Sequence, residues 1–131
     1  MFIDASALTA LLTEEDDARE LLARMAQSKT RLTAPLAVWE AAIAVARVLG
    51  LSITHASEAL ERYLALMEIK VVAVPPETAS IALEAFDRYG KGRHPAQLNF
   101  GDCFAYACAR HLAQPLMFKG ADFPQTDIEA A

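Results

Sequence analysis

The chain has 131 residues, of which 54% are hydrophobic, and a formal net charge of −5. This size and composition predict one folded domain spanning residues 1–131 and exclude a disordered chain. The negative charge argues against a protein that holds nucleic acid by a basic surface alone. It leaves open an enzyme that acts on nucleic acid through a metal, because a metal-binding group of acids adds negative charge of its own.

The apolar runs and the two cysteines indicate in which cellular compartment the protein is expected. No apolar run reaches the roughly 18 residues of a membrane span, and the N-terminus lacks the basic region of a signal peptide, so we expect neither. Cys103 and Cys108 are five residues apart on one predicted helix, a poor geometry for a disulfide. We therefore expect two buried thiols, a reducing cytoplasmic location and no membrane partner.

Strand-like and helical patterns alternate along the chain. Ser6 is expected to cap the first helix, Pro35 to open the third and Gly50 to end it. Thr54 or Ser57 would cap the fourth helix. In chain order the expected elements are a strand at 1–4, helices over 6–12 and 14–28, a strand at 31–33, helices over 35–49 and 54–68, a strand at 70–74, a helix over 76–90, a loop at 90–98, a helix over 100–113 and a strand at 115–118.

This alternation predicts an α/β fold with a mainly parallel sheet covered by helices. In such sheets, functional sites form at the carboxyl ends of the strands. Asp4 and Asp122 both follow a predicted strand, and Asp102 falls in the first turn of a predicted helix. Glu40 lies about a turn and a half inside another predicted helix, and we therefore expect these four acids to converge at one edge of the sheet.

Four acids interrupt apolar stretches, namely Asp4, Glu40, Asp102 and Asp122. A lone carboxylate in a near-core setting is costly unless it is paired, hydrogen-bonded or bound to a metal. Four of them suggest a shared pocket that holds a hard divalent cation, because such ions prefer oxygen ligands. In that arrangement the hydroxyl of Ser6, two residues after Asp4, would support the first carboxylate.

The first two acids also have simpler interpretations. Asp4 could cap the turn that follows the first strand. The helix over 35–49 is expected to bury a face that includes Trp39, Ile43 and Ala46. Glu40 adjoins that face and could reach solvent from its edge.

The other two acids leave similar alternatives open. Asn99 could cap the last helix and form a capping box with Asp102. Capping and metal binding are compatible, because the positive end of a helix favours a carboxylate. Gly101 would let another group approach closely. Asp122 could be a solvated loop acid, and nearby Thr126 could orient a ligand or a water.

The only basic cluster consists of Arg88, Lys91, Arg93 and His94, in and beside the loop that precedes Asp102. Arg88, Lys91 and Arg93 could hold RNA phosphates beside a metal. A solvated loop is the equally open alternative.

Several segments resemble a known family. The stretch Phe2–Leu8 resembles the opening of PIN-domain proteins, and Asn99–Ala107 is similar to the third-acid motif of VapC-type toxins. Leu116–Phe123, with the Thr126–Asp127 pair, is similar to their C-terminal signature. Glu40, in a helix opened by a proline, occupies the place of their second acid. The resemblance covers nearly the whole chain.

The resemblance implies a three-layer α/β/α fold and a ribonuclease that depends on Mg²⁺ or Mn²⁺, acting as the toxin of a type II toxin–antitoxin pair. Carried over to this chain, the acidic set is Asp4, Glu40, Asp102 and Asp122, and the first three would hold the metal. Ser6 and Asn99 match supporting polar positions. A bound ion would activate a water for in-line attack on phosphorus.

The resemblance also implies an RNA substrate, for which tRNA is one candidate, a cognate antitoxin and a homodimer. A dimer surface could come from the helix over 35–49 or the helix over 54–68, although their apolar faces could equally be core. The competing interpretation of the whole chain is a PIN-like interaction module that has lost catalytic activity.

Overall fold

The computed structural model describes residues 1–131 and contains one four-stranded sheet flanked by helices. In chain order the elements are β1 (Phe2–Ile3), α1 (Ala5–Leu12), α2 (Ala18–Ala26), β2 (Leu32–Thr33), α3 (Pro35–Leu49), α4 (Ile53–Leu66), β3 (Lys70–Val71), α5 (Thr78–Tyr89), α6 (Phe100–His111), β4 (Leu116–Met117) and the 3-10 helix η1 (Phe123–Gln125). All strand pairs are parallel, in the order β3-β2-β1-β4. The predicted α/β/α fold with a parallel sheet is therefore confirmed.

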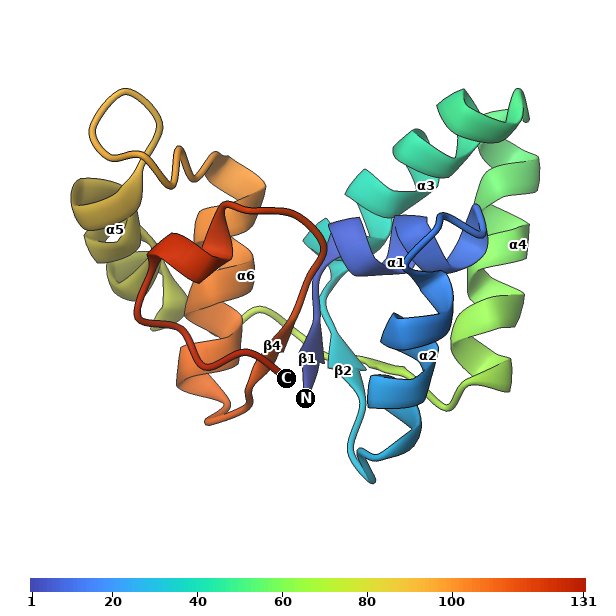
Figure 1. Cartoon of the computed structure of the whole chain (residues 1–131), viewed down its shortest axis with the longest axis horizontal. Helices are drawn as coiled ribbons and strands as arrows, with labels where there is room; N and C mark the ends of the chain where they lie inside the picture. The colour runs from blue at the N-terminus through green and yellow to red at the C-terminus, as the bar shows by residue number, and fades with distance from the viewer.

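The sheet separates two groups of helices. Figure 1 shows α1 to α4 on one side and α5 and α6 on the other. Successive residues of a strand point to opposite faces, so Ile3 and Met117 join the core under the first group while Phe2 and Leu116 join the core under the second. The carboxyl ends of β1 and β4 consequently lie where both groups of helices meet.

Helix α3 begins and ends as predicted. Pro35 occupies the start, and Gly50 follows the end with a φ of 64°, in the left-handed region that a glycine adopts at low cost. The predicted buried face is confirmed only at Ala46, because Trp39 is 66% exposed and Ile43 is 38% exposed. The buried stripe consists of small residues instead, namely Ala37, Ala41, Ala42, Val45 and Ala46.

Helices α3 and α4 pack against each other and cover one face of the sheet. Val45, Leu60 and Leu64, which were candidates for a dimer surface, are buried within the chain. Core packing therefore accounts for them. No single helix has the length and apolarity to cross a bilayer, and α3 and α4 would meet that test only as a pair bent by 118°.

Four helix starts differ from the prediction, and one of them is α5, which begins at Thr78 and not at Pro76. Asp4, not Ser6, is the N-cap of α1, and Ser52 caps α4 in place of Thr54 or Ser57. The helix expected from residue 14 begins at Ala18. The acids before it form a turn, which leaves the helical conformation at Glu14 with a φ of 53°.

Both cysteines are buried on α6 and free, as predicted. Burial raises the pKa of the Cys103 and Cys108 thiols to about 11. At neutral pH they are therefore protonated and act as small apolar residues.

Candidate active site

Asp4 stands at the carboxyl end of β1 and is 4% exposed. Its Oδ2 accepts the Ser6 backbone N–H at 2.9 Å and the Ser6 hydroxyl at 2.5 Å. Burial raises the pKa of Asp4, and the two bonds from Ser6 oppose that rise. The capping interpretation of Asp4 is thus correct, and both bonds from Ser6 go to the same carboxylate oxygen, Oδ2.

The hydroxyl of Ser6 joins two strands of the sheet. It donates to Asp4 after β1 and accepts the backbone N–H of Lys119, two residues after β4, at 3.0 Å. The ammonium of Lys119 pairs with Glu15 and, at 3.3 Å, with Asp17 in the turn before α2. Sequence reasoning missed Lys119, although its place just beyond a strand was a usable signal.

Replacing Ser6 with alanine should lower activity without unfolding the chain. The change removes the donor that orients Asp4 and the acceptor of the Lys119 N–H. Residues that orient a ligand residue typically contribute 10- to 100-fold to activity or metal affinity. We expect a loss of about that size in RNA cleavage, with Ser80→Ala on α5 as the control, because that exposed hydroxyl donates only to the Glu77 carbonyl. Equal activities of the two variants would contradict this role.

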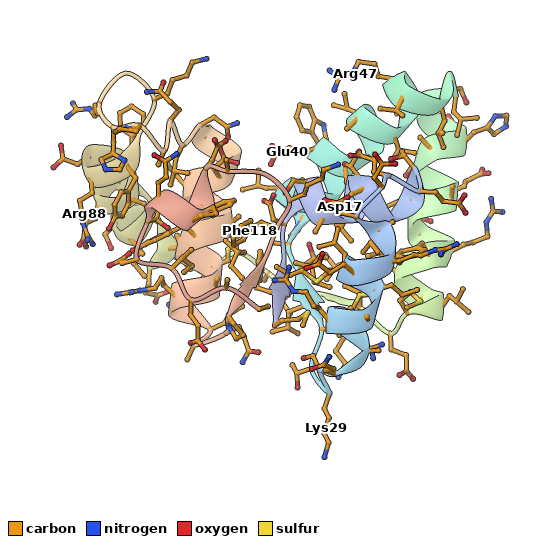
Figure 2. The ribbon with its side chains drawn as sticks, viewed as in Figure 1. Asp17, Lys29, Glu40, Arg47, Arg88 and Phe118 are labelled. Carbon is orange, nitrogen blue, oxygen red and sulfur yellow. The ribbon has the colours of Figure 1, made fainter.

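Glu40 lies in the second turn of α3 with its carboxylate against Gly101 of α6. A Cβ on Gly101 would overlap both carboxylate oxygens, so the predicted close approach at this glycine is made by Glu40. Figure 2 shows Glu40 at the inner end of α3, above the carboxyl ends of the strands. Burial, followed by the charges of Asp4 and Asp102, raises the pKa of Glu40 to about 7.

Asp102 forms the predicted capping box with Asn99 at the start of α6. The Asp102 N–H donates to Asn99 Oδ1 at 2.9 Å, and Asp102 Oδ2 accepts the Asn99 N–H at 3.0 Å. Burial is the main cause that raises the pKa of Asp102 to about 6, with further contributions from Asp4 and Asp122. The capping bond uses one carboxylate oxygen and leaves Oδ1 available.

Asp122 is exposed and precedes η1, where its side chain makes no capping bond. Its charge nevertheless raises the pKa of Asp102. The charges of Asp4 and Asp102 likewise raise the pKa of Glu40, and the charge of Asp4 raises the pKa of Asp102. The four acids, which come from distant parts of the sequence, are therefore close enough to interact electrostatically.

This group fits a hard cation by its chemistry. Asp4, Glu40 and Asp102 offer oxygen donors only, and burial raises the pKa of all three, with neighbouring carboxylates adding to the rise for Glu40 and Asp102. As the side chains stand, no three His, Cys, Asp or Glu residues have the arrangement needed to hold a metal ion.

The comparisons with known proteins identify the family. A model of the PIN domain matches residues 1–129. The chain is 42% identical to a ribonuclease VapC of Mycolicibacterium smegmatis, over 99% of this chain and 98% of the relative. It is 40% identical to ribonuclease VapC30 of Mycobacterium tuberculosis, over 98% of this chain and 95% of the relative. This chain belongs to the PIN-domain family of VapC ribonucleases.

A more distant VapC ribonuclease from Rhizobium meliloti is 36% identical over 97% of this chain and 98% of the relative. The fold also matches the crystal structure of Mycobacterium tuberculosis VapC20, described as a Sarcin-Ricin loop cleaving toxin. That match has a TM-score of 0.76 at 19% identity and covers 99% of this chain and 97% of the other. The resemblance predicted from the sequence is thereby confirmed.

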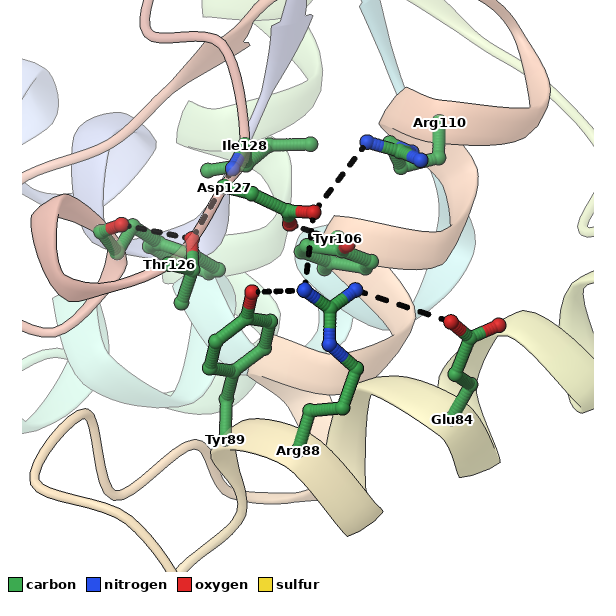
Figure 3. Close-up of polar contacts among 9 residues, drawn as sticks. Glu84, Arg88, Tyr89, Tyr106, Arg110, Thr126, Asp127 and Ile128 are labelled. Atoms are coloured by element: carbon green, nitrogen blue, oxygen red, sulfur yellow. Dashed lines mark hydrogen bonds and ion pairs between the residues drawn. The ribbon is translucent and has the colours of Figure 1, made fainter.

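In this PIN domain, Asp127 fastens the C-terminal tail to the helices. It accepts the Tyr106 hydroxyl at 2.6 Å and Arg88 at 3.2 Å, and Arg110 lies 3.9 Å away (Figure 3). The bond from Tyr106, followed by the two arginines, lowers the pKa of Asp127. These contacts give Asp127 a part in the fold, whereas Asp122 is the tail acid whose charge acts on Asp102.

Thr126 stabilises the same tail. Its hydroxyl donates to the Phe123 carbonyl at 2.7 Å and accepts the Ile128 N–H at 3.2 Å. Its suggested role of orienting a ligand or a water stays a prediction.

The basic cluster is largely engaged in ion pairs. Arg88 pairs with Asp127 and Glu84, and Arg93 pairs with Asp87 at 2.9 Å, whereas Lys91 has no ion pair. Figure 2 shows Arg88 on the α5 side of the molecule, well away from Glu40. Contact of Arg88, Lys91 and Arg93 with RNA stays a prediction, and the two arginines would have to exchange their carboxylate partners to make it.

Proposed function

We propose that this chain is an endoribonuclease, the toxin of a toxin–antitoxin pair, and that Asp4, Glu40, Asp102 and Asp122 form its active site. One observation supports this most directly. Carboxylates that follow β1 and lie on α3 and α6 meet at the carboxyl ends of the strands, where Asp4 and Asp102 raise the pKa of Glu40 and Asp4 raises the pKa of Asp102. The names of the relatives, all ribonucleases, agree with that chemistry.

In this proposal the residues of the site have different roles. Asp4, Glu40 and Asp102 would hold Mg²⁺ or Mn²⁺ through carboxylate oxygens. When bound, the ion supplies the positive charge that acidifies water and stabilises charge developing on a phosphate. Ser6 and Asn99 orient Asp4 and Asp102 through the bonds described above. Asp122 faces the group from the solvent side.

We include the partners in the same proposal. The substrate would be RNA, with tRNA among the candidates, and a cognate antitoxin would control the toxin in the cytoplasm. The carboxylate group is accessible from outside through adjoining grooves, so a partner segment can cover it. A homodimer is proposed from the family alone. The inactive interaction module is not favoured, because all four acids are present and lie together.

The proposal is tested by cleavage of a mixed pool of total RNA and tRNA with Mg²⁺, with Mn²⁺ and with EDTA. We expect discrete fragments that need the ion and are absent with Asp102→Asn, which controls for contaminating nuclease. Mapping the fragment ends would give the target. Fragments of equal yield in EDTA, or with the variant, would contradict a metal-dependent site at these carboxylates.

A further inference from the structure

The C-terminal tail, residues 118–131, forms a closed loop on the same side of the sheet as α5 and α6. It leaves the carboxyl end of β4 and returns to pair with the same strand. There the Leu116 N–H donates to the Glu129 carbonyl at 2.8 Å, and the Ala131 N–H donates to the Leu116 carbonyl at 2.9 Å. Figure 1 shows this segment, in red, passing beside α6. The loop carries Asp122, one of the four acids of the proposed active site.

Asp122 does not fix its own position. Its side chain is exposed and makes no capping bond at η1. Its charge nevertheless acts on Asp102, and such an interaction weakens with distance, so its strength depends on where the backbone of the tail is held. The bond from the Lys119 N–H to the Ser6 hydroxyl holds the tail before Asp122. The contacts of Asp127 hold it afterwards.

One side of α6 lies along the tail. Asp102, Tyr106 and Arg110 are four residues apart and therefore lie on the same side of the helix. The Tyr106 hydroxyl donates to Asp127 at 2.6 Å, and Arg110 lies 3.9 Å from the same carboxylate (Figure 3). The first of the three helix residues interacts with Asp122, and the other two contact Asp127. The tail thus follows α6 from the active site outwards.

Asp127 is held more firmly than an exposed loop acid usually is. Tyr106 is only 3% exposed, and a short bond from a hydroxyl to an ionised carboxylate is among the stronger hydrogen bonds in proteins. Arg88 approaches from α5 at 3.2 Å and also donates to the Tyr89 hydroxyl at 2.6 Å. Between the two tail acids, Phe123 is buried in the core. Release of Asp127 would therefore loosen the segment next to Asp122.

We propose that Asp127, bound by Tyr106 and Arg88, is a positioning residue of the active site, which keeps the tail against α6 with Asp122 near Asp102. The inference rests on the proposed function and adds to it a residue that acts through Asp122. A contact that served the fold alone would affect cleavage equally whether or not position 122 carried a charge. A positioning residue should affect cleavage only while that charge is present.

A double-mutant cycle separates these two cases. Asp127→Ala removes the acceptor, and Tyr106→Phe removes a donor without changing the ring. Each should lower the rate of ion-dependent RNA cleavage on the order of tenfold. In the Asp122→Asn background, each should lower the rate further by less than about twofold, because the side chain that is positioned has lost its charge. The matched controls are Tyr63→Phe on α4 and Asp87→Asn on α5, which should leave the rate unchanged in both backgrounds.

A second measurement does not depend on cleavage. Amide hydrogen exchange of residues 118–128 is followed by mass spectrometry in EDTA, where the chain holds no divalent ion. Asp127→Ala and Tyr106→Phe should each speed exchange in this segment severalfold, because its local opening becomes easier. Protection of α5 and α6 should stay at the wild-type level. That pattern would show a loosened tail on a folded chain.

Other results would overturn the inference. Exchange at the wild-type rate in both variants would show that the tail keeps its place without Asp127. An equal loss of cleavage from Asp127→Ala with and without Asp122→Asn would leave Asp127 a part in the fold alone. If Asp122→Asn cleaved like wild type while Asp102→Asn did not cleave, the positioning role would fail and the proposed function would stand. Absence of ion-dependent cleavage in the wild type would refute the proposed function itself.

Discussion

Replacing Asp102 with asparagine should abolish RNA cleavage and leave the chain folded. Asparagine has the same shape, and its Oδ1 can still accept the Asn99 N–H, so the cap of α6 is kept. The change removes one anionic oxygen donor from the proposed metal site. We expect a loss larger than about 100-fold, the upper range for residues that only orient a ligand. Asp4→Asn should behave in the same way.

The measurement compares cleavage rates and thermal unfolding of both variants in EDTA and in Mn²⁺. Asp87→Asn is the matched control, because it neutralises an exposed carboxylate on α5 that pairs with Arg93. In EDTA the Asp102 variant should be at least as stable as wild type, since fewer like charges then repel one another. A wild-type cleavage rate in either site variant would remove that residue from the active site.

Without divalent ions the chain should unfold less readily at pH 5 than at pH 8. The pKa of Glu40 rises from 4.5 to about 7 on folding and that of Asp102 from 3.8 to about 6. Between those values the folded chain binds more protons than the unfolded chain, so the free energy of unfolding decreases as pH rises. We expect the free energy of unfolding to fall by about 1–2 kcal/mol in total between pH 5 and pH 8. A full conversion at about 1.4 kcal/mol for each unit of pKa shift would give more, but water screens the half-exposed Glu40.

Urea unfolding at a series of pH values in EDTA measures this dependence. Glu40→Gln should reduce the dependence of stability on pH, because the variant lacks the carboxyl group whose pKa rises to about 7. Saturating Mn²⁺ should flatten it too, by supplying the positive charge that the carboxylates lack. Asp127 does not obscure the effect, since its lowered pKa affects stability only below about pH 4. If stability in EDTA rose from pH 5 to pH 8, the carboxylates could not have raised pKa values in the folded chain.

The sequence predicts elements well where local chemistry defines them. Pro35 and Gly50 bound α3 in both the prediction and the structure, and the Asn99–Asp102 capping box forms as expected. Each of these features depends on residues only a few positions apart. The parallel sheet followed from the alternation of strands and helices, and the expected convergence of the acids followed from their places near the strand ends, whereas the strand order was not predicted.

The errors arise where several local patterns compete or where partners are distant. Nearly every residue of α3 is apolar, so the pattern could not show that small alanines pack inward while Trp39 and Ile43 face solvent. The pairing of Arg88 with Asp127 spans 39 residues and has no local signature. The bond between the Lys119 N–H and Ser6 spans 113 residues and depends on the sheet order.

Because Gly101 has no side chain and the Glu40 carboxylate lies against it, position 101 should tolerate substitution less well than other uncharged positions near the acids. Loss of an acid would normally require a change at the acid itself. Here one added carbon on a neighbour with no functional group would push the Glu40 carboxylate from its place. Natural or selected inactive forms of this protein should therefore include substitutions at position 101 that leave every charge of the chain unaltered.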